Sequence, residues 1–185
     1  MIVTFTPLLV AMALLWPAAA SAFDIGPAVG TQAPPISARD AAGKAVTIKS
    51  LSDKNGVVLV FFRSAKWCPF CQKQLVNLKD AQAPLAQRGY KLVALSYDSP
   101  EVLTAFTAKQ KIGFTLLSDQ GSTTIDAFKL RDPQYKEGSF AYGVPMPGIF
   151  VISPRGVVQA KLAEEGYRNR PPVSAVLAAV DGVRR

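Results

Sequence analysis

The chain of 185 residues contains no histidine and only two cysteines. Without histidine, neither a Ser-His-Asp nor a Cys-His nucleophile arrangement can form. Two cysteines also fall short of the four Cys and His ligands that a closed structural zinc site uses. Because Gln72 follows the second cysteine, the Cys-x-x-Cys-His signature of covalent haem attachment is absent too. We therefore predict a protein that uses no metal and no cofactor.

Long runs of like charge are missing as well. The formal net charge is +8, but the Lys and Arg residues are scattered, and no basic run exceeds Arg184-Arg185. The sequence shows none of the motifs typical of DNA- or RNA-binding domains. This pattern favours a solvated basic surface over a nucleic-acid partner, with a mild preference for acidic partner surfaces.

Residues 1–22 carry no charged side chain at all. An apolar stretch at residues 8–16 is interrupted by Pro17, and Ala20-Ser21-Ala22 forms a small-residue cleavage site. This arrangement predicts a signal peptide that is cleaved after Ala22, so that the protein is exported, to the periplasm of a bacterium. An uncleaved membrane anchor is the alternative, because an uncharged segment of this length nearly spans a bilayer core of about 30 Å.

The two cysteines follow an apolar run at residues 57–62 and stand in the order Trp67-Cys68-Pro69-Phe70-Cys71. The order predicts a strand, a turn and then a Cys-x-x-Cys motif that opens a helix. A thiol at a helix N-terminus meets unpaired N–H groups and the positive end of the helix dipole, and both stabilise the thiolate. We expect Cys68 to be exposed at the turn, with Cys71 one helical turn behind it. A disulfide across two residues closes too small a loop to stabilise the fold much, which favours redox chemistry over a structural bridge.

The rest of the chain alternates between predicted strands and helices. Strands are predicted at residues 45–49, 57–62, 90–96, 114–117, 148–153 and 157–162, and helices at 69–88 (kinked or broken by Pro84), 100–112, 123–130 and 171–183. Residues 23–44 form an irregular lead-in and residues 131–147 an ordered loop. This alternation predicts one α/β domain at residues 45–185, built on a layered sheet.

Three stretches carry a resemblance to a known family. They are Trp67 to Cys71, the segment Leu95 to Glu101 followed by Thr115 to Asp119, and Tyr142 to Ile152. Together they resemble the thioredoxin-like superfamily, and more narrowly its peroxiredoxin-like (AhpC/TSA, redoxin) branch, from about Pro34 to the C-terminus. The resemblance implies a thioredoxin-like fold with a central mixed β-sheet flanked by helices.

The resemblance also assigns roles around the cysteines. The thioredoxin family has a cis-proline just before a late strand, and Pro147 matches it, so we predict a cis Met146–Pro147 bond. Such a turn leaves the preceding backbone free to pair with an extended substrate chain, which makes Met146 and Pro147 substrate-binding residues. Trp67, Pro69 and Phe70 are predicted to present an apolar surface to the substrate, although ordinary core packing is the alternative for Trp67. Lys66 is predicted to lower the pKa of Cys68.

Several family residues are replaced. The peroxidatic motif Pro-x-x-x-Thr/Ser-x-x-Cys, aligned on Cys68, would place its proline at Phe61 and its hydroxyl at Ala65. The peroxiredoxin arginine falls at Pro147, so that another arginine, such as Arg63 or Arg168, would have to take its place. The buried aspartate of thioredoxins falls at Phe62, and the proton acceptor for Cys71 is therefore unidentified.

These observations leave three functions open. The leading hypothesis is an exported thiol–disulfide oxidoreductase, in which Cys68 attacks a disulfide of a partner protein and Cys71 resolves the mixed disulfide. The alternative is a thiol peroxidase, in which a hydroperoxide converts Cys68 to a sulfenic acid that condenses with Cys71. Either enzyme needs a thiol reductant or another redox partner. The third possibility is a binding scaffold with a fixed disulfide, with residues 131–147 as its contact loop.

Overall fold

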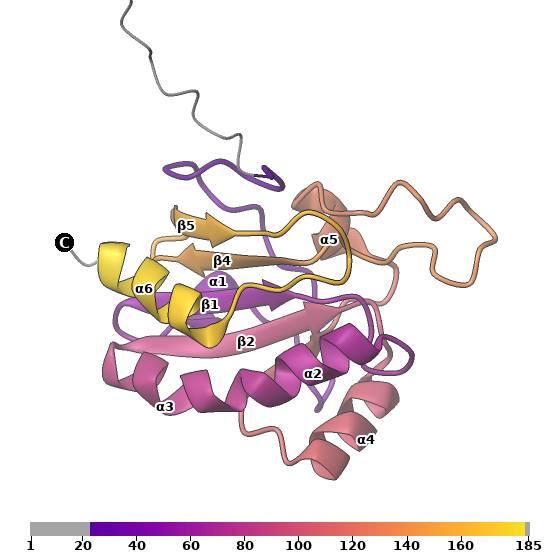
Figure 1. Ribbon diagram of the computed structural model, residues 1–185, viewed down its shortest axis with the longest axis horizontal. Helices are drawn as coiled ribbons and strands as arrows, with labels where there is room; N and C mark the ends of the chain where they lie inside the picture. The colour runs from indigo at the N-terminus through magenta and orange to yellow at the C-terminus, as the bar shows by residue number, and fades with distance from the viewer. Residues whose placement is uncertain (1–22, 184–185) are drawn as a thin grey trace, which may run out of the picture.

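The computed structural model describes residues 23–183, and the predictions for residues 1–22 lie outside this range (Figure 1). Its centre is a five-stranded sheet in the order β3-β2-β1-β4-β5. The strands are β1 (Gly56–Phe61), β2 (Tyr90–Ser96), β3 (Thr115–Ser118), β4 (Gly148–Ile152) and β5 (Val158–Leu162). The helices are α1 (Ile48–Leu51), α2 (Pro69–Asn77), α3 (Lys79–Gln87), α4 (Pro100–Gln110), α5 (Thr123–Ala127) and α6 (Val173–Val183).

The sheet is mixed, as the resemblance implied. Strand β1 pairs in parallel with β2 and antiparallel with β4, while β2–β3 is parallel and β4–β5 antiparallel. All residues of β1 are buried, because the strand has neighbours on both edges and cover on both faces. A strand in that position reads as a continuous apolar run rather than as an alternating one.

Alternate residues of β1 enter two separate halves of the core. Val58 and Val60 face α2, α3, α4 and α6, and pack in a cluster that also contains both cysteines. Val57, Leu59 and Phe61 face the other side, where α1, α5 and apolar residues of the lead-in cover the sheet. Helices α2, α3 and α6 lie in front of the sheet in the view of Figure 1. The lead-in is therefore irregular in backbone but part of the core.

Two local predictions were wrong in detail. Residues 45–49 do not form a strand, because Thr47 and Ser50 make a reciprocal capping box that starts α1 at Ile48. The helix after the cysteines is interrupted at Leu78, upstream of Pro84, which lies inside α3. None of the helices within residues 23–183 has the length and apolar character that crossing a bilayer requires.

Candidate redox site

Cys68 and Cys71 form a disulfide at the N-terminus of α2. Cys68 is the N-cap residue, and its Sγ accepts a hydrogen bond from the backbone N–H of Cys71 at 3.3 Å. Pro69 occupies the first helical position, where a missing N–H costs nothing. The expectation of an exposed Cys68 was wrong: its exposed fraction is 2 %, and that of Cys71 is 0 %. Both cysteines belong to the core cluster that α2, α3, α4 and α6 form with one face of the sheet.

Asp98 fixes the turn that leads into the cysteines. Its carboxylate accepts hydrogen bonds from the Ser64 hydroxyl at 2.7 Å and from the Ala65 backbone N–H at 2.6 Å. The Ser96 hydroxyl donates a third hydrogen bond at 3.0 Å. Burial raises the pKa of Asp98 above its ordinary value, while these hydrogen bonds act in the opposite direction. The carboxylate thus joins the ends of β1 and β2, and it was not predicted from the sequence.

Trp67 lies between the turn and the 131–147 loop. Its indole Nε1 donates to the hydroxyl of Tyr97 at 3.0 Å, and its ring meets that of Phe140 edge-on at 5.4 Å. Burial raises the pKa of Tyr97. The backbone N–H groups of Lys66 and Trp67 both donate to the Ser64 hydroxyl. The Lys66 side chain is exposed, and no contact among the described residues joins its ammonium to Cys68.

Arg63, one of the two arginines singled out in the sequence, is almost fully buried directly after β1. Its Nη1 donates to Asp132 Oδ2 at 2.9 Å and its Nη2 to the Tyr135 hydroxyl at 2.7 Å. The guanidinium also lies 5.6 Å from the ring centroid of Trp67 and 5.1 Å from that of Tyr167. Arg63 therefore anchors the 131–147 loop beside the disulfide.

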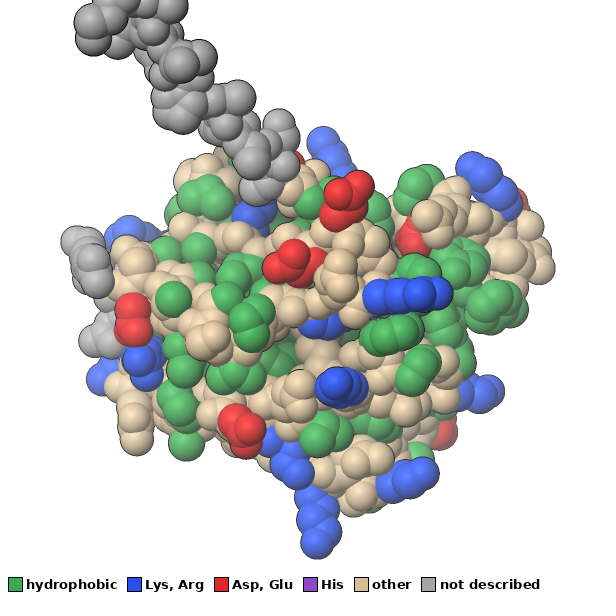
Figure 2. All heavy atoms as spheres, in the orientation of Figure 1, with side chains coloured by type: hydrophobic (Ala, Val, Ile, Leu, Met, Phe, Trp, Pro, Cys, Tyr) green, Lys and Arg blue, Asp and Glu red, His purple; other side chains and the backbone are tan. Residues whose placement is uncertain are grey.

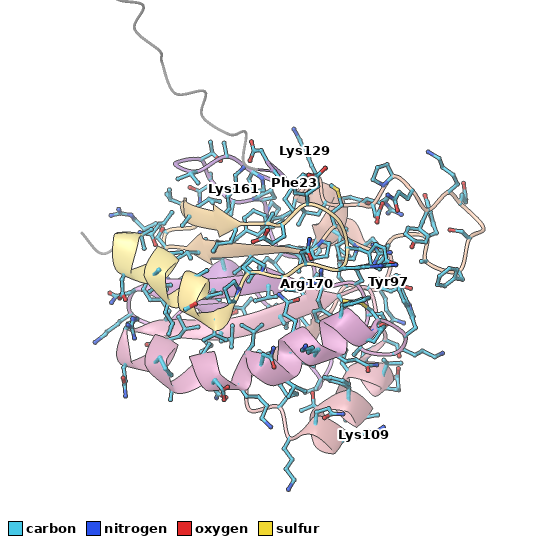
Figure 3. All side chains as sticks on the ribbon, in the orientation of Figure 1. Phe23, Tyr97, Lys109, Lys129, Lys161 and Arg170 are labelled. Atoms are coloured by element: carbon cyan, nitrogen blue, oxygen red, sulfur yellow. A yellow bond between two sulfur atoms is a disulfide. The ribbon has the colours of Figure 1, made fainter. Side chains whose placement is uncertain are left out.

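Arg170, which the sequence analysis missed, brings a charged side chain into contact with the disulfide. Its Nη2 lies 3.4 Å from Cys71 Sγ, and its Nε donates to Gln74 Oε1 at 2.9 Å. Figure 3 shows Arg170 between α2 and the loop that joins β5 to α6. Burial, aided by the charge of Arg63, lowers the pKa of Arg170 to about 10. Arg168, the other arginine singled out in the sequence, is exposed and donates to the Tyr167 hydroxyl.

The predicted cis peptide bond is absent from residues 23–183, and Met146–Pro147 is trans. The backbone N–H of Met146 donates to the carbonyl of Leu130 at 2.6 Å, inside the returning 131–147 loop. This bond occupies the group that was expected to pair with a substrate chain. Met146 and Pro147 line a pocket of about 350 Å³ together with Arg63, Asp132 and Tyr167, and their substrate-binding role stays a prediction.

Exposed aromatic side chains surround the disulfide. Phe70 and Tyr167 meet edge-on at 5.9 Å, and both are partly exposed. On the 131–147 loop, Phe140 has an exposed fraction of 75 %. Figure 2 shows hydrophobic side chains gathered on this loop, at the right of the view. Phe70, Tyr167 and the loop thus expose apolar surface near the disulfide, while the substrate-binding role of Trp67, Pro69 and Phe70 stays a prediction.

The site is thus a Cys-x-x-Cys disulfide at the N-cap of the helix that follows the central strand of a mixed sheet, and the fold is thioredoxin-like. Residues 29–161 match the model of the AhpC/TSA family, and the chain belongs to that family.

The relatives are peroxiredoxins. The chain is 33 % identical over 132 residues to the chloroplastic peroxiredoxin Q of Sedum lineare, covering 70 % of this chain and 66 % of that one. It is 32 % identical over 99 residues to the peroxiredoxin Bcp of Escherichia coli, covering 54 % and 62 %. The match thus spans less than two thirds of either relative. A mutant of the peroxiredoxin 6 of Arenicola marina has the same fold, with a TM-score of 0.76 at 17 % identity, covering 86 % of this chain and 74 % of that one.

Proposed function

We propose that the protein is a thiol peroxidase that reduces hydroperoxides through Cys68 and Cys71. The observation that carries the proposal is the bonded cysteine pair at a helix N-terminus in a chain of the AhpC/TSA family. The curated relatives named peroxiredoxin support the peroxidase alternative better than the leading hypothesis from the sequence.

The chemistry takes two steps at sulfur. The Cys68 thiolate attacks the terminal oxygen of a hydroperoxide, a sulfur–oxygen bond forms as the O–O bond breaks, and the leaving alkoxide takes up a proton. Cys71 then attacks the Cys68 sulfenic acid, and hydroxide leaves as water while the disulfide forms. A thiol reductant supplies the two electrons and two protons that restore both thiols.

The shape of the site favours a small oxidant over a protein disulfide. Cys68 has almost no exposed surface, and the Met146 N–H is already bonded within the chain. A hydroperoxide needs only a narrow path to the sulfur, whereas an extended polypeptide needs free backbone groups along which to lie. Arg63 and Arg170 flank the site, and guanidinium groups can stabilise the charge that develops on the departing oxygen.

The test is rapid oxidation of the fully reduced protein by hydrogen peroxide, quenched with acid and followed by titration of the remaining thiols. We expect oxidation orders of magnitude faster than that of a free thiol at the same pH. The Cys68→Ser variant should lose the fast reaction, and Cys71→Ser should keep it but stop at a sulfenic acid. A wild-type rate equal to that of a free thiol, together with rapid reduction of a disulfide-bonded protein, would restore thiol–disulfide exchange as the function.

We further propose that residues 1–22 direct export to the bacterial periplasm. The support is the uncharged apolar stretch and the Ala20-Ser21-Ala22 site. The full chain should yield a periplasmic product whose N-terminal residue is Phe23. An intact N-terminus in the membrane fraction would mean that the segment is an anchor.

A further inference from the structure

The guanidinium of Arg170 is held by neutral groups alone. Its Nη1 donates to the carbonyls of Tyr167 and Asn169, both at 2.6 Å, and its Nε donates to Gln74. Among residues 23–183, no carboxylate lies within salt-bridge distance of Arg170. A partly buried cation without a counter-ion is unfavourable, since desolvation disfavours the charged form.

No neighbouring carboxylate pairs with Arg170 among the described residues. Arg63 adds a second cation, the buried carboxylate of Asp132 is paired with Arg63, and that of Asp98 accepts hydrogen bonds from neutral donors. The remaining charged side chains around the site are exposed, namely Lys66, Glu164, Glu165 and Arg168. A disulfide brings no charge, whereas a thiolate at Cys71 would place a negative charge 3.4 Å from Arg170 Nη2.

We propose that Arg170 is a catalytic residue that holds Cys71 as a thiolate when the disulfide is reduced. The thiolate of Cys71 is then ready to attack the Cys68 sulfenic acid, and it is also the leaving group when a reductant thiolate attacks Cys68. This proposal rests on the proposed function for its first step only. It identifies a charge partner for Cys71 in a chain that has Phe62 where thioredoxins have an aspartate.

Gln74 supports this arrangement from the same helix as Cys71. Its side chain is buried one helical turn after the cysteine, and its Oε1 faces the Nε of Arg170. The guanidinium is therefore bound on one side by α2 and on the other by the backbone of the loop between β5 and α6. Its position over Cys71 depends on both segments rather than on a single flexible contact.

The first experiment measures the ionisation of Cys71 without any hydroperoxide. In a Cys68→Ser background, the thiolate absorbance near 240 nm is followed against pH with Arg170, with Arg170→Gln and with the matched surface control Arg155→Gln. We expect the pKa of Cys71 to lie below the ordinary thiol value of about 8.5 with Arg170 and in the control. Arg170→Gln should raise it by at least about one unit, which means roughly tenfold less thiolate at neutral pH.

A third variant, Arg170→Lys, controls for misfolding of the Arg170→Gln protein. Arg170→Lys keeps the positive charge but loses the planar fork that grips Gln74, so we expect an intermediate pKa. Superimposable titration curves for the Arg170, Arg170→Gln and Arg170→Lys proteins would overturn the proposal. This result is independent of the peroxidase hypothesis, because a lowered pKa of Cys71 would serve thiol–disulfide exchange equally well.

The second experiment tests the resolving step in the full chain with both cysteines. After one equivalent of hydrogen peroxide, a cyclic 1,3-diketone traps any sulfenic acid, and the adduct is located by mass spectrometry. We expect little adduct in the wild type and at least about tenfold more on Cys68 in Arg170→Gln, in proportion to the lost thiolate. An unchanged yield, or an adduct on Cys71, would contradict the assigned role. Absence of any fast peroxide reaction in either protein would instead count against the proposed function.

Discussion

Replacing Asp98 with asparagine tests whether this carboxylate holds the turn before the cysteines. The substitution keeps the size of the side chain but replaces one carboxylate oxygen with an amide that donates hydrogen bonds. The carboxylate accepts from Ser64, Ala65 and Ser96 at 2.6–3.0 Å. The amide oxygen can replace Oδ2, which accepts from Ala65 and Ser96, but the amide nitrogen then faces the Ser64 hydroxyl, which already accepts from two backbone N–H groups.

The magnitude follows from those contacts. A hydrogen bond to a charged group contributes about 1.5–3 kcal/mol, and the one from the Ser64 hydroxyl is lost while the bonds from Ala65 and Ser96 pass to a neutral amide oxygen. We therefore expect Asp98→Asn to lower the free energy of unfolding by about 2 kcal/mol. For a chain of this size that corresponds to a fall in Tm of roughly 4–8 °C. Oxidation of Cys68 by hydrogen peroxide should slow as well, because the turn no longer holds the helix N-terminus in place.

The matched control is Asp40→Asn. Asp40 also accepts backbone hydrogen bonds in a turn, from Ala42 and Lys44, but this turn is exposed and remote from the disulfide. Urea denaturation of both variants and of the wild type gives the comparison. Equal losses for the two variants, or an Asp98→Asn protein with wild-type stability and wild-type oxidation rate, would refute the role of Asp98.

The same variant gives a pH test. Because the folded state raises the pKa of Asp98, it binds that proton more tightly than the unfolded state does. The stability that Asp98 contributes is therefore fully present below its unfolded pKa, near 3.8, and declines as the pH rises through the folded value. Asp98→Asn should therefore lower the free energy of unfolding by more at pH 4 than at pH 7. If the two proteins differ in the free energy of unfolding by the same amount over this pH range, burial does not raise the pKa of Asp98.

Three further substitutions test the packing around the site. Leu75→Ala should lower the free energy of unfolding by about 2–5 kcal/mol in urea, because Leu75 is fully buried beneath the cysteines, and a loss under 1 kcal/mol would contradict that. Arg63→Met should cost about 3 kcal/mol and open residues 131–147 to proteolysis, since Asp132 is left as a buried unpaired charge; unchanged proteolysis would show that the loop is held otherwise. Phe140→Ala should change the free energy of unfolding by no more than about 0.5 kcal/mol but increase acrylamide quenching of Trp67, whose ring Phe140 contacts. A larger loss of stability with unchanged quenching would place Phe140 in the core.

The strands were predictable because of where they lie in the sheet. Strands β1, β2 and β4 are buried along almost their whole length, and a strand buried on both faces shows itself as a run of apolar residues. Helix α1 was not predictable in the same way. It has only four residues, and the capping pair Thr47 and Ser50 determines it rather than any apolar periodicity.

The site was predictable only where its chemistry is local in sequence. The Cys-x-x-Cys motif can be recognised directly in the sequence, and Arg63 lies only five residues before Cys68. Arg170 lies 99 residues beyond Cys71, in a polar loop that gives no pattern, so its contact with the sulfur appears only in three dimensions. The Met146–Pro147 bond shows the opposite limit, because the family motif predicted a cis bond and the structure has a trans one.

The topology explains why these distant segments meet. Because β1 and β2 are parallel, their carboxyl ends, followed by Arg63 and Asp98, lie at one edge of the sheet. Strand β4 runs antiparallel to β1, so its first residues lie at that edge, with Gly148 opposite Phe61. Strand β5 ends there in turn, with Leu162 opposite Ile149, and the loop that follows carries Arg170.

Among the described residues at this edge, Arg170 has no carboxylate partner. Arg63 pairs with Asp132, and Asp98 is held by hydroxyl and amide donors. Reduction to a Cys71 thiolate therefore places a negative charge next to Arg170. On this argument, removing Asp132 would strengthen the preference for the reduced thiolate, whereas removing Arg170 would abolish it. A measurement of the disulfide reduction potential in the Asp132→Asn and Arg170→Gln proteins should show shifts of opposite sign, and shifts of the same sign would exclude an electrostatic origin.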